Sequence, residues 1–288
     1  MSVEPHVPIE FKDRKTGLIV FGILTASMGA VCALSVPLML LGHAVSARAA
    51  DASQNFQALI PGLVMFTSLA ITFIWLGIGS MMARRWARAL LLVMSWSGLI
   101  VGIITIAALA AMVPQLSAMV DSARQPGQPE IPPSARSCIM AVSATFGVVI
   151  YVVIPAVGVF FYGSRHVKAT CEVRDPVIRW TDRCPLPMLA CVPWLVFGAV
   201  MMLIAPLAYR GVFPFFGTFV TGPTGSAIYL VLAGLWAYAA WALYHLDRRG
   251  WWIIFVALFL FAVSAFITYS RHDVAELYRL MGTPEPQS

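Results

Sequence analysis

The residues best suited to chemistry lie in one charged segment, Ser164–Pro187. Six of its side chains could move protons, act as nucleophiles or bind a metal: His166, Cys171, Glu172, Asp175, Asp182 and Cys184. Carboxylates beside a histidine suit acid–base work on a lipid or quinone, and two cysteines with a histidine suit zinc. The cysteine spacing fits no compact zinc knuckle, and paired charges in a solvated loop explain the same residues. We therefore predict no metal site and no catalytic residue here.

An aromatic face is the second place where a ligand could bind. Trp252, Phe255 and Phe259 share one face of a predicted helix, which suits a quinone, a pigment or a lipid. Contact with lipid tails and anchoring at the membrane surface explain the same side chains. All lysines lie outside the apolar stretches described next, which excludes a retinal Schiff base. No cofactor is predicted.

The chain that positions these residues has a composition too apolar for a soluble protein. Of its 288 residues, 60% are hydrophobic and 11% are charged, whereas a soluble domain has about 25% charged residues. Lipid must therefore cover much of the surface. Seven uncharged stretches approach the roughly 20 residues needed to span a bilayer: 17–41, 58–82, 89–113, 139–161, 188–207, 227–243 and 251–269. We predict an all-α fold, a polytopic transmembrane helix bundle of about seven spans over 17–269.

The distribution of Lys and Arg predicts the orientation of these spans. Thirteen of the 19 lie on the side of the N-terminal segment 1–16, and six lie on the other side. Because positive loops stay in the cytoplasm, we expect a cytoplasmic N-terminus and an outer C-terminus. Two short turns carry the clearest determinants of topology: Arg84, Arg85, Arg88, Arg248 and Arg249. The net charge of +6 suits anionic lipid, so the bilayer is the predicted partner and nucleic acid is not.

Three segments outside the spans have distinct characters. The loop Pro114–Arg136 is rich in Pro and Gln and is expected to be mobile and solvated. The loop Tyr209–Gly225 is apolar yet interrupted by Gly and Pro, so it should lie along the outer interface or dip into the protein. Residues 270–288 should form an outer amphipathic helix followed by a disordered tail.

Small residues indicate where helices approach closely. Gly98 and Gly102 form a GlyxxxGly pair in the third predicted span, and Gly22, Ala26 and Ala30 form a similar stripe in the first. Helices in lipid associate through close backbone contact at such residues. The partner helix can belong to the same chain, which is the commoner case, or to another protein.

Two short basic and aromatic turns resemble each other, at 83–88 and 247–252. They raise the hypothesis of a parallel repeat with a 3 + 1 + 3 grouping of helices, although any tight cytoplasmic turn collects Arg and Trp. The segment 77–90, GIGSMMARRWARAL, resembles uncharacterised bacterial polytopic inner-membrane proteins. That resemblance implies a bacterial inner membrane and no particular activity.

Three functions remain open from the sequence. The favoured one is a non-catalytic subunit that packs against or organises other membrane subunits or a second copy, because the spans lack ionisable groups and carry small-residue stripes. The second is a permease or flippase for a neutral or amphipathic solute. The third is a lipid- or quinone-modifying membrane enzyme that uses the charged segment.

Overall fold

The computed structural model describes residues 12–49, 56–122, 133–272 and 274–281, which are almost entirely helical. Within these ranges seven helices are long and apolar enough to cross a membrane: Lys15–Ser46, Ile60–Met81, Arg85–Met112, Ala141–Gly163, Leu186–Ala208, Gly222–Tyr244 and Arg248–Arg271. The predicted all-α class with seven spans is therefore confirmed. The chain is an integral, multi-pass membrane protein.

Several helices run beyond the predicted apolar stretches, because a helix can continue where the hydrocarbon ends. Helix α1 covers Lys15–Ala49, and α3 covers Arg85–Ser122. The predicted loop Pro114–Arg136 was thus wrong at both of its ends, since α3 passes through Pro114 and residues 133–136 are helical. Helix α4 then begins at Pro133, and residues 123–132 lie outside the described residues.

The contacts divide the chain into two compact units. The first contains Met1–Ile19 and Met82–Arg179, and the second contains Val20–Met81 and Trp180–Ser288. This division does not follow the order of a 3 + 1 + 3 repeat, which stays a prediction.

The fourth span, in the first unit, is built from three helical pieces. Helix α4 (Pro133–Val148) leads into a π-helical turn, η2 (Val149–Val153), and then into α5 (Ile154–Gly163). In the π-turn the N–H of Ile154 donates to the carbonyl of Val149, five residues earlier. Pro155 follows, and a proline ring crowds the carbonyl four residues before it, here that of Tyr151. The wider turn relieves this crowding.

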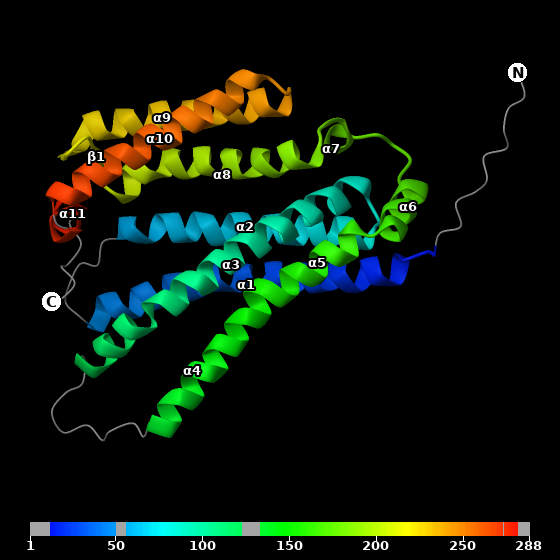
Figure 1. Ribbon diagram of the computed structural model, residues 1–288, viewed down its shortest axis with the longest axis horizontal. Helices are drawn as coiled ribbons and strands as arrows, with labels where there is room; N and C mark the ends of the chain where they lie inside the picture. The colour runs from blue at the N-terminus through cyan, green and yellow to red at the C-terminus, as the bar shows by residue number, and fades with distance from the viewer. Residues whose placement is uncertain (1–11, 50–55, 123–132, 273, 282–288) are drawn as a thin grey trace, which may run out of the picture. The chain divides into compact units, whose positions relative to one another are not determined.

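Helix α3 packs along both α5 and the π-turn (Figure 1). A Cβ atom on residue 102 would overlap the carbonyl oxygen of Tyr151, so only glycine fits there. A Cβ on residue 98 would lie 3.5 Å from the Pro155 ring, an ordinary contact. Gly102 is thus the member of the GlyxxxGly pair that allows close approach, and the approach is within the chain.

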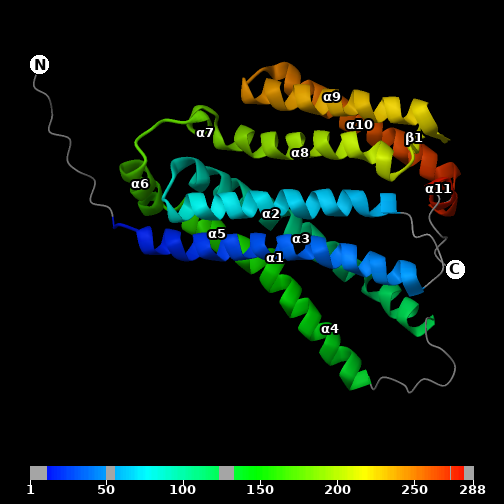
Figure 2. The same ribbon diagram turned by 180° about the vertical axis from the view of Figure 1, so that it is seen from behind.

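In the second unit, the part of α1 from Val20 onwards lies along α2 (Ile60–Met81; Figure 2). A Cβ on residue 22 would come within 2.8 Å of the carbonyl oxygen of Gly77, and one on residue 29 within 2.8 Å of Ile74 Cγ1. Ala30 is exposed, so Gly29 takes the place in the contact that the sequence analysis gave to Ala30. At 3.6 residues per turn, a step of seven residues from Gly22 returns to the same face more closely than a step of eight.

The other helices of this unit are α8 (Leu186–Ala208), α9 (Gly222–Tyr244) and α10 (Arg248–Arg271). Helix α9 packs against both α8 and α10 in each view (Figures 1 and 2). Their core contains Leu195, Ala239, Ala240 and Leu243. Alanines at the crossing permit close backbone approach. The short elements η1 (Phe56–Leu59) and α7 (Trp180–Arg183) also belong to this unit.

The segment Tyr209–Gly225 contains a β-hairpin, and its last residues, from Gly222, begin α9. Strand β1 (Phe213–Phe215) pairs antiparallel with β2 (Thr218–Val220), with Phe215 opposite Thr218. Both turn residues, Phe216 and Gly217, have positive φ, as the common two-residue hairpin turn requires.

Two hydroxyl groups of α10 accept hydrogen bonds from the turn of this hairpin. The N–H of Phe216 donates to Ser264 Oγ at 2.9 Å, and the N–H of Gly217 donates to Thr268 Oγ1 at 3.0 Å. Ser264 Oγ also donates to the carbonyl of Pro214 at 2.9 Å. Ser264 lies seven residues before the end of α10, which is about 10 Å along the helix. The hairpin therefore covers roughly the last two turns of this span, and its turn N–H groups are satisfied by protein rather than by water.

Helix α11 covers Val274–Met281, where an amphipathic helix was predicted. The predicted disordered tail lies outside the described residues.

Candidate functional site

The charged segment of the first unit is ordered rather than a solvated loop. Helix α6 spans Arg165–Arg174, and its N-terminus is capped by the Ser164 hydroxyl, which accepts from the N–H of His166 at 3.3 Å. Val167, Thr170 and Cys171 are buried on the face that packs towards α3 and α5. The charged side chains occupy the remaining face.

Asp175 is the most unusual residue of this site, because a carboxylate that is only 2% exposed carries two ion pairs. Arg84 Nη1 lies 3.5 Å from its Oδ1, and Arg179 Nε lies 3.5 Å from its Oδ2. The N–H of Arg85 also donates to Oδ2 at 3.4 Å. A buried carboxylate is tolerated when it is paired in this way. The arrangement ties the end of α6 to the start of α3.

Glu172 makes weaker contacts beside it. Its Oε1 lies 3.7 Å from Arg85 Nη2 and 3.9 Å from Lys168 Nζ. Exposed pairs at such distances contribute little to stability. Arg88 acts differently, since its Nε donates to the carbonyl of Tyr162 at 3.0 Å. That contact satisfies a carbonyl at the C-terminal end of α5.

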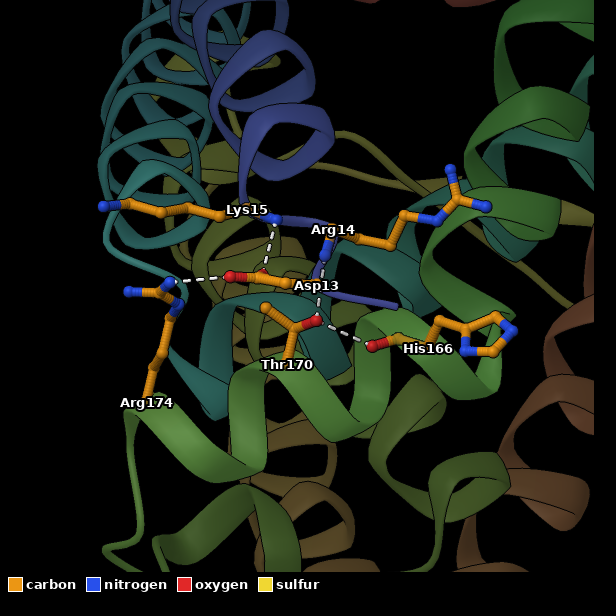
Figure 3. Close-up of polar contacts among 6 residues, drawn as sticks. All are labelled: Asp13, Arg14, Lys15, His166, Thr170 and Arg174. Atoms are coloured by element: carbon orange, nitrogen blue, oxygen red, sulfur yellow. Dashed lines mark hydrogen bonds and ion pairs between the residues drawn. The ribbon is translucent and has the colours of Figure 1, made fainter. Parts of the chain in front are cut away.

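Two neighbouring contacts join the N-terminal segment to α6 (Figure 3). Arg174 Nη2 donates to Asp13 Oδ2 at 2.8 Å, and the N–H of Arg14 donates to Thr170 Oγ1 at 3.1 Å. The Thr170 hydroxyl in turn donates to the carbonyl of His166 at 2.8 Å. Asp13 also accepts from the N–H of Lys15 at 3.0 Å. These bonds, with that from Arg174 foremost, lower the pKa of the Asp13 carboxyl.

The cysteines of the charged segment are buried thiols. Burial raises the pKa of Cys171 to about 11, and burial raises that of Cys184 as well. A thiol with such a pKa is protonated near neutral pH and is a poor nucleophile and metal ligand. Among the described residues, no group of three His, Cys, Asp or Glu side chains is arranged to hold a metal ion. Asp182 and Cys184 belong to the second unit.

The other residues singled out by the sequence lie on helix surfaces or at helix starts. Trp252, Phe255 and Phe259 are exposed along one side of α10, and the first two rings meet edge to face at 6.2 Å. Arg248 and Arg249 are exposed in the first turn of α10. The N-cap of this helix, Asp247, accepts from the N–H of Arg249 at 3.0 Å.

Sequence reasoning missed two features that required long-range contacts. The burial of Asp175 was missed, although an Asp before Pro176 with Arg on either side was a signal. The role of Ser264 and Thr268 was missed too, although two hydroxyls four residues apart in an apolar span suggest a polar partner.

Comparison with known protein families, curated proteins and solved structures finds no match in any of the three.

Proposed function

We propose that this chain is a non-catalytic membrane protein that packs against other membrane helices, from a partner subunit or a second copy. The fourth span carries the proposal. Only 6% of its most apolar 18 residues are buried within the chain, against 33% for the third span. Its exposed first half contains Ser143, Ala144 and the half-exposed Gly147. Small residues on an uncovered face are what close helix association in lipid requires.

Contacts in the charged segment support a structural role for the enzyme candidates. Asp175 joins α3 to α6, Glu172 lies between two cationic side chains, and Cys171 is a buried protonated thiol. Each of these residues therefore has a part in holding the segment together. The permease hypothesis stays a prediction from the sequence.

The experiment measures the mass of the protein in lipid nanodiscs. It compares the wild type with a variant that has larger side chains on the fourth span. Ser143→Leu combined with Ala144→Leu should give a monomer with an unchanged thermal midpoint, because both positions are exposed. Ala237→Leu, which adds one leucine at an exposed position of α9, should leave the association intact. The proposal would be refuted if the wild-type protein were a monomer bound only to lipid under every mild extraction condition.

The same proposal includes a bacterial inner membrane and a cytoplasmic N-terminus. The resemblance of residues 77–90 to bacterial inner-membrane proteins supports the first. The contact of Asp13, Arg84 and α6 within one unit supports a common side for the N-terminus and two basic loops, as the excess of Lys and Arg requires. Fusions of green fluorescent protein and alkaline phosphatase to each terminus test it. Fluorescence at the N-terminus with phosphatase activity at the C-terminus is expected, and the reverse pattern would contradict it.

A further inference from the structure

An exposed aliphatic cluster lies within the most charged part of the chain. Val173, Val177 and Ile178 are 66%, 58% and 65% exposed. Arg174 and Arg179 stand beside them in the sequence. A segment in water gains nothing from three exposed branched aliphatics, whereas apolar side chains flanked by Arg are typical of segments that lie in a membrane interface.

The contacts of Asp175 keep this cluster close to one end of a membrane span. Its carboxylate contacts Arg84 and the backbone N–H of Arg85, and Arg85 is the first residue of the third span. Ile178 follows Asp175 by three residues, which limits its distance to about 10 Å along the chain. The interfacial layers together add roughly 10–15 Å to the 30 Å hydrocarbon core. The aliphatic side chains are thus close enough to the start of the third span to reach the boundary between headgroups and acyl chains.

The charge around the cluster selects the kind of lipid. At this end of the first unit the described residues include ten Lys and Arg and three Asp and Glu. All three acidic residues have cationic partners within the unit, so a large positive excess remains. Arg14, Arg165 and Lys168 contribute exposed side chains to it. Basic side chains at a membrane surface attract anionic headgroups.

We propose that residues 173–179 are an interfacial anchor for anionic phospholipid. Val173, Val177 and Ile178 insert into the boundary of the leaflet at this end of the protein, and the surrounding basic side chains pair with lipid phosphates. Asp175 positions the anchor by holding the segment against the start of α3. The anchor adds a lipid-binding site to the bundle and does not depend on the association proposed for the fourth span.

Spin-label accessibility in nanodiscs tests this depth directly. The full-length protein carries Cys138→Ser, which removes an exposed native thiol, and a nitroxide on Ile178→Cys. Lys168→Cys is the matched control on the charged face of α6. At position 178 the ratio of oxygen to nickel-chelate accessibility should exceed that at position 168 by about tenfold, because a polar chelate is excluded from an apolar layer. Equal ratios at the two sites would overturn the proposal.

A second measurement tests the choice of lipid. The thermal midpoint of the wild type should rise when phosphatidylglycerol replaces part of the phosphatidylcholine. Val177→Ser combined with Ile178→Ser should reduce this rise, and Lys168→Gln should reduce it while leaving the label at 178 buried. No rise in the wild type would overturn the proposal. A label at 178 that is shielded from both oxygen and nickel only when another protein copurifies would also overturn it, in favour of a protein partner.

Discussion

The two units hold segments that do not span the membrane against their membrane spans by different chemistry. In the first, the N-terminal segment and α6 are joined to α3 by charged groups, with Asp175 at their centre. In the second, the hairpin is joined to α10 by neutral hydroxyl and backbone groups, with Ser264 and Thr268 at their centre. Charged pairs are strong when buried but costly to break singly. Neutral hydrogen bonds cost less to bury and contribute less. The two units should therefore differ in how they respond to substitution and to pH.

The largest effect is expected at the buried carboxylate of the first unit. Asp175→Ala leaves Arg84 and Arg179 without their shared partner, and breaking a buried pair costs about 3 kcal/mol. We expect a loss of this size rather than a larger one because both arginine side chains are about one-third exposed. Unfolding of the micelle-bound protein by dodecyl sulfate measures the loss. Asp182→Ala, at an exposed position of α7, is the control. An equal loss of stability in both variants would show that Asp175 does not hold α6 to α3.

A similar loss is expected inside the first unit at the π-turn. Gly102→Ala places a Cβ on the carbonyl oxygen of Tyr151, so α3 and the fourth span must separate, at a cost of about 1–3 kcal/mol. Gly98→Ala meets the Pro155 ring at an ordinary distance and should change stability by no more than about 0.5 kcal/mol. The same unfolding assay distinguishes them. If both variants behaved alike, GlyxxxGly spacing rather than the π-turn would govern this contact.

The hydroxyl contacts of the second unit should give a smaller loss. Thr268→Val keeps the shape of the side chain but leaves the N–H of Gly217 without an acceptor, which costs about 1–2 kcal/mol. Ser270→Ala removes an exposed hydroxyl that bonds only within its own helix, and it should have little effect. Amide exchange at Gly217, measured by NMR, should accelerate in the first variant alone. Unchanged exchange would mean that the hairpin is held by its aromatic contacts.

What the sequence could predict follows from how local each feature is. Spans depend on the composition of about 20 consecutive residues, so all seven were found, and α11 was found by its spacing. Several helices extend past the predicted stretches because hydropathy marks the hydrocarbon rather than the ends of a helix. The π-turn depends on Pro155 together with a glycine on another helix. The burial of Asp175 depends on Arg84, 91 positions away in the chain, and no local pattern contains that contact.

The smallest effect, and the sharpest contrast between the units, is expected from pH. His272 Nδ1 lies 2.8 Å from Glu276 Oε2, and its Nε2 lies 3.0 Å from the carbonyl oxygen of Gly217. Both neighbours are acceptors, so the doubly protonated ring suits the site, and these contacts, led by that with Glu276, raise the pKa of His272 above its usual 6.5. Arg271 opposes the shift. Stabilisation by His272 is fully present below pH 6.5 and is lost as the pH rises through the raised pKa.

Asp13 behaves in the opposite sense, because its pKa is lowered from 3.8. Its contact with Arg174 is present above that value and is lost only as the pH falls through the lowered pKa. As the pH rises from 6.5 through the raised pKa of His272, the hairpin should therefore loosen while the N-terminal segment does not. Amide exchange corrected for its intrinsic pH dependence measures this at Phe216 and at Arg14. His272→Gln should abolish the dependence at Phe216. A dependence that persists in this variant would place the titrating group elsewhere in the second unit.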